Sequence, residues 1–89
     1  MKSRTMPGLW VLMAALPIHV RKQAREAYRM YAADPKHPSL RFKRVFHDPP
    51  TYSVRVGLAY RAVGALVGDT IIWYWIGTHA DYDHLLKQL

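Results

Sequence analysis

The stretch YRAVGALVGDTIIWYWIG, residues 60–77, carries the pattern that decides the fold. Two apolar segments, 60–67 and 70–77, are separated by Gly68-Asp69, a dipeptide typical of the two-residue turn in a β-hairpin. In the second segment, residues on both faces of the predicted strand are apolar, which indicates a central strand covered by helices on one side. The stretch therefore predicts an antiparallel hairpin at the centre of a sheet.

Two segments upstream show the same two-residue period. RFKRVF, residues 41–46, predicts one strand, which the prolines of DPP at 48–50 end. TYSVRVG, residues 51–57, predicts another, whose apolar residues alternate with Ser53 and Arg55. With the hairpin, these segments make a mostly antiparallel sheet of four strands. We expect one face of this sheet to take the helices and the other to carry the arginines.

Helical patterns precede the strands. LWVLMAAL, residues 9–16, predicts a short apolar helix ended by Pro17, and residues 18–33 predict a second helix ended by Asp34-Pro35. The second helix has one apolar stripe, formed by Val20, Ala24, Ala27, Tyr28 and Tyr31. The predicted fold class is α+β, with an N-terminal helical hairpin packed on the sheet. Residues 1–8 are predicted to be a flexible leader, with the remnant of a short strand as the alternative. Residues 9–89 are predicted to be a single domain, whose tail ADYDHLLKQL adds a final helical turn.

The composition points to anionic partners. The chain has 89 residues and no cysteine, which fits one domain and excludes disulfides, thiolate metal sites and a thiol nucleophile. Lysine and arginine number 13 against 6 aspartates and glutamates, giving a formal net charge of +7. Such a surplus on a small domain favours nucleic acid or an acidic protein, although a basic surface can also serve solubility alone.

The N-terminus resembles a secretion signal only in part. Lys2 and Arg4 precede the apolar run 9–16, but that run is too short to span a bilayer and has no small-residue cleavage site after it. We therefore expect a cytoplasmic protein without a membrane partner.

Cations recur on two predicted surfaces. Arg55, Arg61 and Lys43 lie in the predicted strands, where neighbouring like charges repel unless a phosphate sits between them. The alternative is that their long stems cover apolar surface with the charges in water. Arg25 belongs to a row of arginines spaced by four residues on the second helix, which is either a solvated face or a face for an anionic partner.

His79 follows the last strand directly, and Tyr82 comes three residues later. The end of a rigid strand can fix an imidazole for proton transfer, whereas Tyr82 can stack on a base or donate a hydrogen bond. The alternative is a packing role at a strand end. The segment THADYDH also resembles the zinc signature His-x-His-x-Asp-His of metallo-β-lactamase-like hydrolases, but Asp81 replaces the second histidine. We therefore expect neither a metal site nor a cofactor.

The order of these motifs resembles the RelE/ParE superfamily of bacterial toxins over residues 9–86. The resemblance is carried by HPSLRFKRV, YSVRVGLAYRAV and GDTIIWYWIGTHADYDHLL in this order and spacing. It implies the toxin of a type II toxin–antitoxin system, neutralised by an acidic antitoxin with which it forms a hetero-oligomer. In ribonuclease members the ribose 2′-hydroxyl attacks the adjacent phosphate of mRNA on the ribosome, without a metal.

The resemblance also implies roles for individual residues. Arg61 matches the phosphate-clamping arginine, Arg55 a second basic position, His79 the catalytic histidine, and Tyr82 the aromatic position near the C-terminus. Lys43 matches a phosphate contact more weakly. The remaining predicted RNA-binding cations are Arg41, Arg44 and Arg25.

The chain departs from the family pattern at two places. Ser53 stands where some ribonuclease members have lysine, and the ending lacks the Gly-Lys-Arg cluster of RelE. A non-catalytic, ParE-like inhibitor of DNA gyrase therefore remains the alternative to a ribonuclease. A third possibility is a binding module for nucleic acid or protein without toxicity. The apolar run 9–16 predicts contact with the antitoxin or with a second toxin copy.

Overall fold

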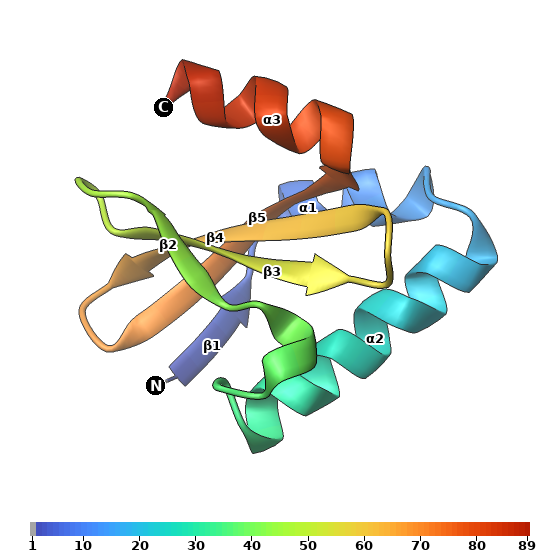
Figure 1. The fold of residues 1–89 in the computed structure, drawn as a ribbon, viewed down its shortest axis with the longest axis horizontal. Helices are drawn as coiled ribbons and strands as arrows, with labels where there is room; N and C mark the ends of the chain where they lie inside the picture. The colour runs from blue at the N-terminus through green and yellow to red at the C-terminus, as the bar shows by residue number, and fades with distance from the viewer. Residues whose placement is uncertain (1) are drawn as a thin grey trace.

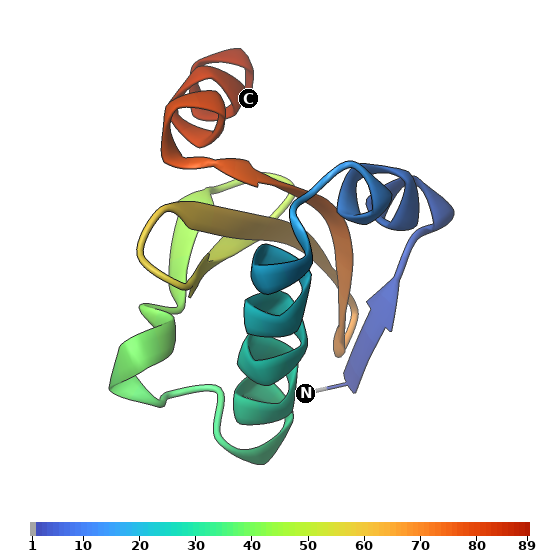
Figure 2. The same ribbon diagram turned by 90° about the vertical axis from the view of Figure 1, so that its right-hand side faces the viewer.

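The computed structural model describes residues 2–89 as a five-stranded sheet with helices on both faces (Figure 1; Figure 2). The strands lie in the order β1-β5-β4-β3-β2. β1 runs parallel to β5, and the other neighbours are antiparallel. The helices α1 and α2 cover one face, and α3 lies on the other. The elements in chain order are β1 (Lys2–Thr5), α1 (Pro7–Ala14), α2 (Ile18–Ala33), the 3-10 helix η1 (Pro38–Leu40), β2 (Lys43–Phe46), β3 (Thr51–Val56), β4 (Tyr60–Val67), β5 (Thr70–Thr78) and α3 (His79–Gln88).

The predicted hairpin and central strand are confirmed. Val67 and Thr70 pair across the two-residue turn, in which Gly68 has a φ of 63°. Such a positive φ is the conformation for which glycine is favoured in these turns. β5 lies between β1 and β4 and therefore has a hydrogen-bonded neighbour on each side.

A register shift in β5 places its two tryptophans, Trp73 and Trp75, on opposite faces of the sheet. Val63 pairs with Trp75, but the next residue, Gly64, pairs with Trp73, so β5 contains one extra residue at this point. Strict alternation would place both indoles on one face, whereas the bulge turns Trp73 toward the α1–α2 face and Trp75 toward the α3 face. A Cβ on Gly64 would lie 2.8 Å from the Trp73 ring, and one on Gly77 2.7 Å from the Trp75 ring. Glycine is needed at both positions because each indole packs directly on the backbone there.

The sheet has five strands rather than the four expected from the sequence. Residues 2–5, predicted to belong to a leader or to the remnant of a short strand, pair with β5 as an edge strand. The Trp73 indole donates a hydrogen bond of 3.0 Å to Ser3 Oγ, and Met6 N donates one of 3.0 Å to Trp73 O. The segment KSRT contains no apolar residue and therefore lacks the alternation that predicts a strand; its backbone bonds to β5 hold it in place.

The two N-terminal helices pack on the same sheet face. α2 has the predicted bounds, and its stripe buries Val20, Ala27 and Tyr31, but Tyr28 is largely exposed at the stripe's edge. α1 begins at Pro7, two residues before the predicted start, because proline fits the first position of a helix. No helix among residues 2–89 combines the length and apolar character needed to cross a membrane. The buried core between these helices and the sheet consists of Leu9, Met13, Ala27, Tyr31, Leu40, Val54, Val56, Ile71, Trp73 and Ile76.

The tail is a full helix rather than one final turn. Thr78 caps α3, because its hydroxyl accepts a hydrogen bond of 3.2 Å from Asp81 N. Tyr82 on α3 is buried, and its hydroxyl lies 2.9 Å from Ser53 Oγ on β3. The second sheet face is therefore partly covered by α3 instead of being left open to the arginines.

Candidate functional site

One end of the sheet, at the β3–β4 turn, gathers the principal residues predicted from the sequence. Arg55 on β3 and Arg61 on β4 are cross-strand partners. Arg55 Nε donates to Gly57 O and Arg61 Nη1 donates to Tyr60 O, each at 2.9 Å. The His79 backbone N–H donates to Ala59 O of the same turn at 2.9 Å. The turn thus fixes two guanidinium groups and the first residue of α3 at one end of the molecule.

Two directly paired arginines repel each other, so the contacts that hold them matter. Each guanidinium has five N–H donors, and one of these bonds a backbone carbonyl near the turn. These bonds fix the position of each arginine side chain, and the remaining N–H donors of each guanidinium stay available for an anion. Arg55 also lines a hollow of about 340 Å³ at the free edge of β3, next to α2 and η1. Arg61 is opposite Gly77 on β5, which has no side chain to cover it.

His79 is exposed and oriented by its own helix. The side chain is 52% exposed, and Nδ1 lies 3.2 Å from Asp83 Oδ2, one turn later. In the neutral imidazole, a proton on Nδ1 would be favoured by the nearby Asp83 carboxylate, which leaves the lone pair of Nε2 free. This arrangement can take a proton from a hydroxyl group. The ring also contacts Tyr82 edge-on, with centroids 5.7 Å apart.

Tyr82 was predicted to be a catalytic or base-stacking group, and the structure gives it a different environment. The residue is only 3% exposed and bonds Ser53 beneath α3. In this conformation the ring is not accessible to a nucleobase. It anchors α3 to β3 and therefore holds the helix turn that carries His79. Ser53 is the partner that this anchor needs.

The other predicted phosphate contacts are dispersed. Lys43 is exposed on β2 and pairs with Ser53, so it shares the α3 face. Arg41 is exposed at the end of η1 with a φ of 47°. Arg44 bonds Phe46 O and His47 O at 3.4 and 2.8 Å and is committed to the β2–β3 turn. Arg25 lies on α2, across the sheet from His79.

The residue that sequence reasoning missed is Asp83. Its four-residue spacing from His79 would have revealed the contact if the whole tail had been predicted as helix. Within residues 2–89, no three histidine or acidic side chains are grouped so that they could share a metal ion. The pKa values of Tyr31 and Tyr74, both away from this site, are raised chiefly because burial disfavours the phenolate.

Comparisons with known proteins agree on one family of folds. The model of the ParE-like toxin domain matches residues 18–84. The structure resembles a chain of the RelB–RelE antitoxin–toxin complex from Methanococcus jannaschii, with a TM-score of 0.68 and 23% identity over 90% of this chain and 95% of that one. A copper-bound mutant toxin from Helicobacter pylori gives a TM-score of 0.58 and 14% identity over 91% and 97% of the two chains. No curated protein matches by sequence.

Proposed function

This chain belongs to the ParE-like toxin domain family, and from that premise we propose that it is a metal-independent endoribonuclease that cleaves mRNA on the ribosome. It is the toxin of a toxin–antitoxin system of the RelE/ParE kind. The observation that supports the ribonuclease proposal is that Arg55, Arg61 and the exposed His79 each bond a backbone carbonyl at or beside the β3–β4 turn. These groups have the chemistry that cleavage of a phosphodiester requires.

In the proposed reaction, His79 Nε2 accepts the proton of a ribose 2′-hydroxyl. The 2′-oxygen forms a bond to the adjacent phosphorus while the bond from phosphorus to the 5′-oxygen breaks. The products are a 2′,3′-cyclic phosphate and a free 5′-hydroxyl, whose proton comes from water. Arg61 and Arg55 stabilise the extra negative charge on the phosphate oxygens in the transition state.

Lys43 is proposed to contact a neighbouring phosphate, because it is exposed on the face that carries His79. Arg41 is proposed to extend this contact as an exposed cation at the end of η1. Tyr82 supports catalysis indirectly by holding α3. The net charge of +7 favours a strongly anionic target such as ribosomal RNA. A ribosomal target implies action in the cytoplasm.

The proposed protein partner is an acidic antitoxin encoded beside this chain. The support is the similarity to a chain of an antitoxin–toxin complex and the basic surface of this protein. An acidic segment would compensate the surplus of positive charge when it binds.

The test is cleavage of mRNA by purified protein in the presence of programmed ribosomes, with the new ends mapped. The His79→Ala variant should lose about a hundredfold or more of the cleavage rate, as expected for removal of a general base. His84→Ala is the matched control, because His84 is an exposed histidine on the same helix; it should cleave normally. Equal cleavage by wild type and His79→Ala would refute the assigned mechanism.

A second candidate is inhibition of DNA gyrase, which is favoured by the description of the matching family as ParE-like. A gyrase inhibitor would block supercoiling in vitro and leave mRNA intact in cells, and His79→Ala would not affect it. The two assays therefore separate the candidates.

A further inference from the structure

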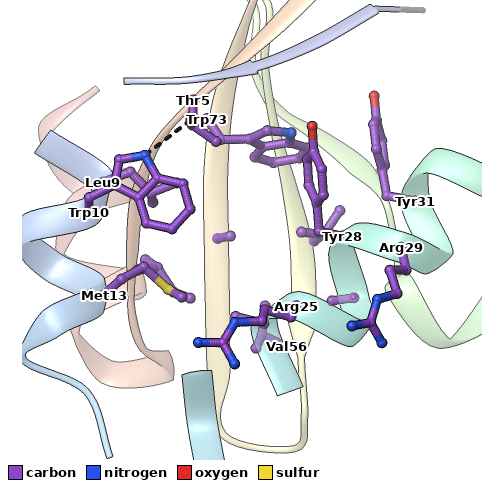
Figure 3. A pocket seen from close by; sticks show the side chains of 15 residues that line it. Thr5, Leu9, Trp10, Met13, Arg25, Tyr28, Arg29, Tyr31, Val56 and Trp73 are labelled. Atoms are coloured by element: carbon purple, nitrogen blue, oxygen red, sulfur yellow. Dashed lines mark hydrogen bonds between the residues drawn. The ribbon is translucent and has the colours of Figure 1, made fainter. Parts of the chain in front are cut away.

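Two hollows of different character lie along α2. The groove between α1, α2 and the sheet has a volume of about 390 Å³ and mostly apolar walls, with Arg25 and Arg29 at its rim (Figure 3). The hollow at the free edge of β3, called here the β3-edge hollow, has a volume of about 340 Å³ and is lined from α2 by Gln23 and Glu26. The helix therefore presents cations to the first hollow, but an amide and a carboxylate to the second.

The β3-edge hollow adjoins the candidate site through the β3–β4 turn. The pairing of β2 with β3 ends at Ser53, and α2 and η1 contact β3. Arg55 lines the hollow and donates to Gly57 O, which lies at the same turn. The missing side chain of Gly57 lets the Gln23 amide lie against this turn, since a Cβ there would be 2.5 Å from Gln23 Oε1. A phosphate held by Arg55 would therefore bring an adjacent nucleotide to the mouth of the hollow.

The lining of the β3-edge hollow combines apolar surface with a few polar groups. Met30 and Leu40 provide apolar surface, and Gln23 and Glu26 provide hydrogen-bonding groups. Leu58 also lines the hollow and is 83% exposed, more than any other large apolar side chain among residues 2–89. Such a combination is typical of pockets for small ligands. A nucleobase matches it, because a base has two apolar faces and a polar edge.

Glu26 is out of place on a surface that binds only phosphates. It is the only acidic residue of α2, which has four arginines and lysines. Within residues 2–89, the Glu26 carboxylate has no ion pair and the Gln23 side chain no hydrogen bond. A carboxylate beside Arg55 would repel a phosphate, but it can accept hydrogen bonds from the N–H groups of a base. Gln23, three residues earlier on the same helix face, can donate or accept beside it.

These groups select among the four bases of RNA. The Watson–Crick edge of guanine presents two adjacent donors, N1–H and the N2 amino group, which one carboxylate can accept together. Its O6 can accept a hydrogen bond from the Gln23 amide. Adenine and cytosine present an amino group next to an acceptor, and uracil presents one N–H between two acceptors. Guanine therefore fits Glu26 and Gln23 better than the other bases do.

We propose that the β3-edge hollow is a nucleobase subsite, in which Glu26 and Gln23 bind the edge of a guanine next to the scissile phosphate and Leu58 packs against its face. The inference rests on the proposed function in taking RNA to be the ligand of Arg55. It adds to that function a preference for guanine at one fixed position beside the cut.

The first test measures binding without cleavage. The probes are the 3′,5′-bisphosphates of guanosine and adenosine, which offer one base and two phosphates and contain no internucleotide bond to cleave. Titrations followed by the amide NMR signals of the full chain give the dissociation constants. The guanosine compound should bind about fivefold or more tightly, as for one bidentate contact to a base, and should shift the signals of Gln23 and Gly57. Equal affinity for the two compounds would overturn the subsite.

A substitution at Glu26 tests the polar edge of the subsite. Glu26→Gln keeps the size of the side chain but removes the paired acceptors, so the preference for guanosine bisphosphate should fall to about twofold or less. Asp69→Asn is the matched control, because it makes the same change of charge at the β4–β5 turn, outside the hollow. It should keep the full preference. An undiminished preference in Glu26→Gln would show that this carboxylate does not read the base.

A substitution at Leu58 tests the apolar part. Leu58→Ala should weaken the binding of both bisphosphates about threefold to tenfold without changing their ratio, because the loss of apolar contact affects every base. Leu58→Met should restore most of the affinity. Val67→Ala is the control, since Val67 is also exposed, at 59%, but lies outside the hollow. Wild-type affinity in Leu58→Ala would contradict the assigned contact, and thermal unfolding checks that each variant is folded.

Cleavage on programmed ribosomes separates this inference from the proposed function. On mRNAs that differ in one base beside the cut, the wild type should favour guanine about fivefold or more, and Glu26→Gln should lose the preference. Cleavage without any base preference would overturn the subsite and leave the ribonuclease intact. Preferential binding of guanosine bisphosphate with uncut mRNA would instead refute the ribonuclease and leave a guanine site. If neither bisphosphate binds at millimolar concentration, the subsite is wrong, whatever the outcome of the cleavage assay.

Discussion

The two faces of the sheet differ in what they leave exposed. The α1–α2 face contains most of the buried core and leaves an apolar groove with a basic rim. On the α3 face, a polar pair of Ser53 and Tyr82 anchors one helix, and His79 stays exposed at its start. The bulge in β5 serves both faces by giving each of them one tryptophan. One face therefore supplies most of the buried core, while the other carries the proposed chemistry.

The largest expected effect tests whether the α1–α2 face carries the stability. Trp73→Ala should lower the free energy of unfolding by about 3–5 kcal/mol, because a buried indole leaves a cavity. Trp75→Ala should cost clearly less, because Trp75 is only partly buried on the α3 face. Urea unfolding of both variants measures the difference. Equal losses would mean that the two faces contribute alike.

An intermediate effect tests the anchor of α3. Tyr82→Phe removes the hydroxyl and leaves Ser53 buried without its partner, which should cost about 1–3 kcal/mol in unfolding free energy. The double variant Ser53→Ala/Tyr82→Phe should regain part of this loss, because no buried hydroxyl is then left alone. If Tyr82 acts only by positioning α3, mRNA cleavage should recover together with stability in the double variant. A cleavage defect that persists at restored stability would instead indicate a direct role of the phenol.

The smallest effect concerns the orientation of His79. Asp83→Asn keeps the size of the side chain but removes its charge, and cleavage should fall by about threefold to tenfold, which corresponds to losing about 1 kcal/mol of orienting interaction. Unfolding free energy should change by less than about 1 kcal/mol, because the pair is exposed on the helix surface. Asp81→Asn on the same helix is the control, since Asp81 makes no side-chain contact with His79 among the described residues. Unchanged cleavage in Asp83→Asn would show that His79 needs no such partner.

The sequence predicted the parts of the fold that follow a local rule. Gly68-Asp69 between two apolar segments predicted the hairpin, and Asp34-Pro35 predicted the end of α2. The edge strand at residues 2–5 was predicted only as the alternative to a flexible leader, because its polar side chains show no alternation; only its pairing with β5 makes it a strand. The bulge that places Trp73 and Trp75 on opposite faces was not predicted, because a bulge leaves no mark in composition.

The sequence predicted which strands carry the arginines of the candidate site, but not which side chains are buried or which groups they contact. Alternation alone placed Arg55 and Arg61 on one face, and the cross-strand pairing agrees with that prediction. Burial of Tyr82 depended on a complete C-terminal helix and on a serine in another strand, neither of which a local pattern reveals. The two carbonyls that hold Arg44 in the irregular β2–β3 turn also follow from no local pattern.

The two outermost strands have a consequence for the behaviour of the free protein. β1 and β2 are each 4 residues long, and each carries two cations, Lys2 with Arg4 and Lys43 with Arg44. Short, positively charged edges discourage the edge-to-edge pairing by which sheets assemble into aggregates. The free protein would therefore stay dispersed at concentrations at which an apolar edge would start to form fibrils.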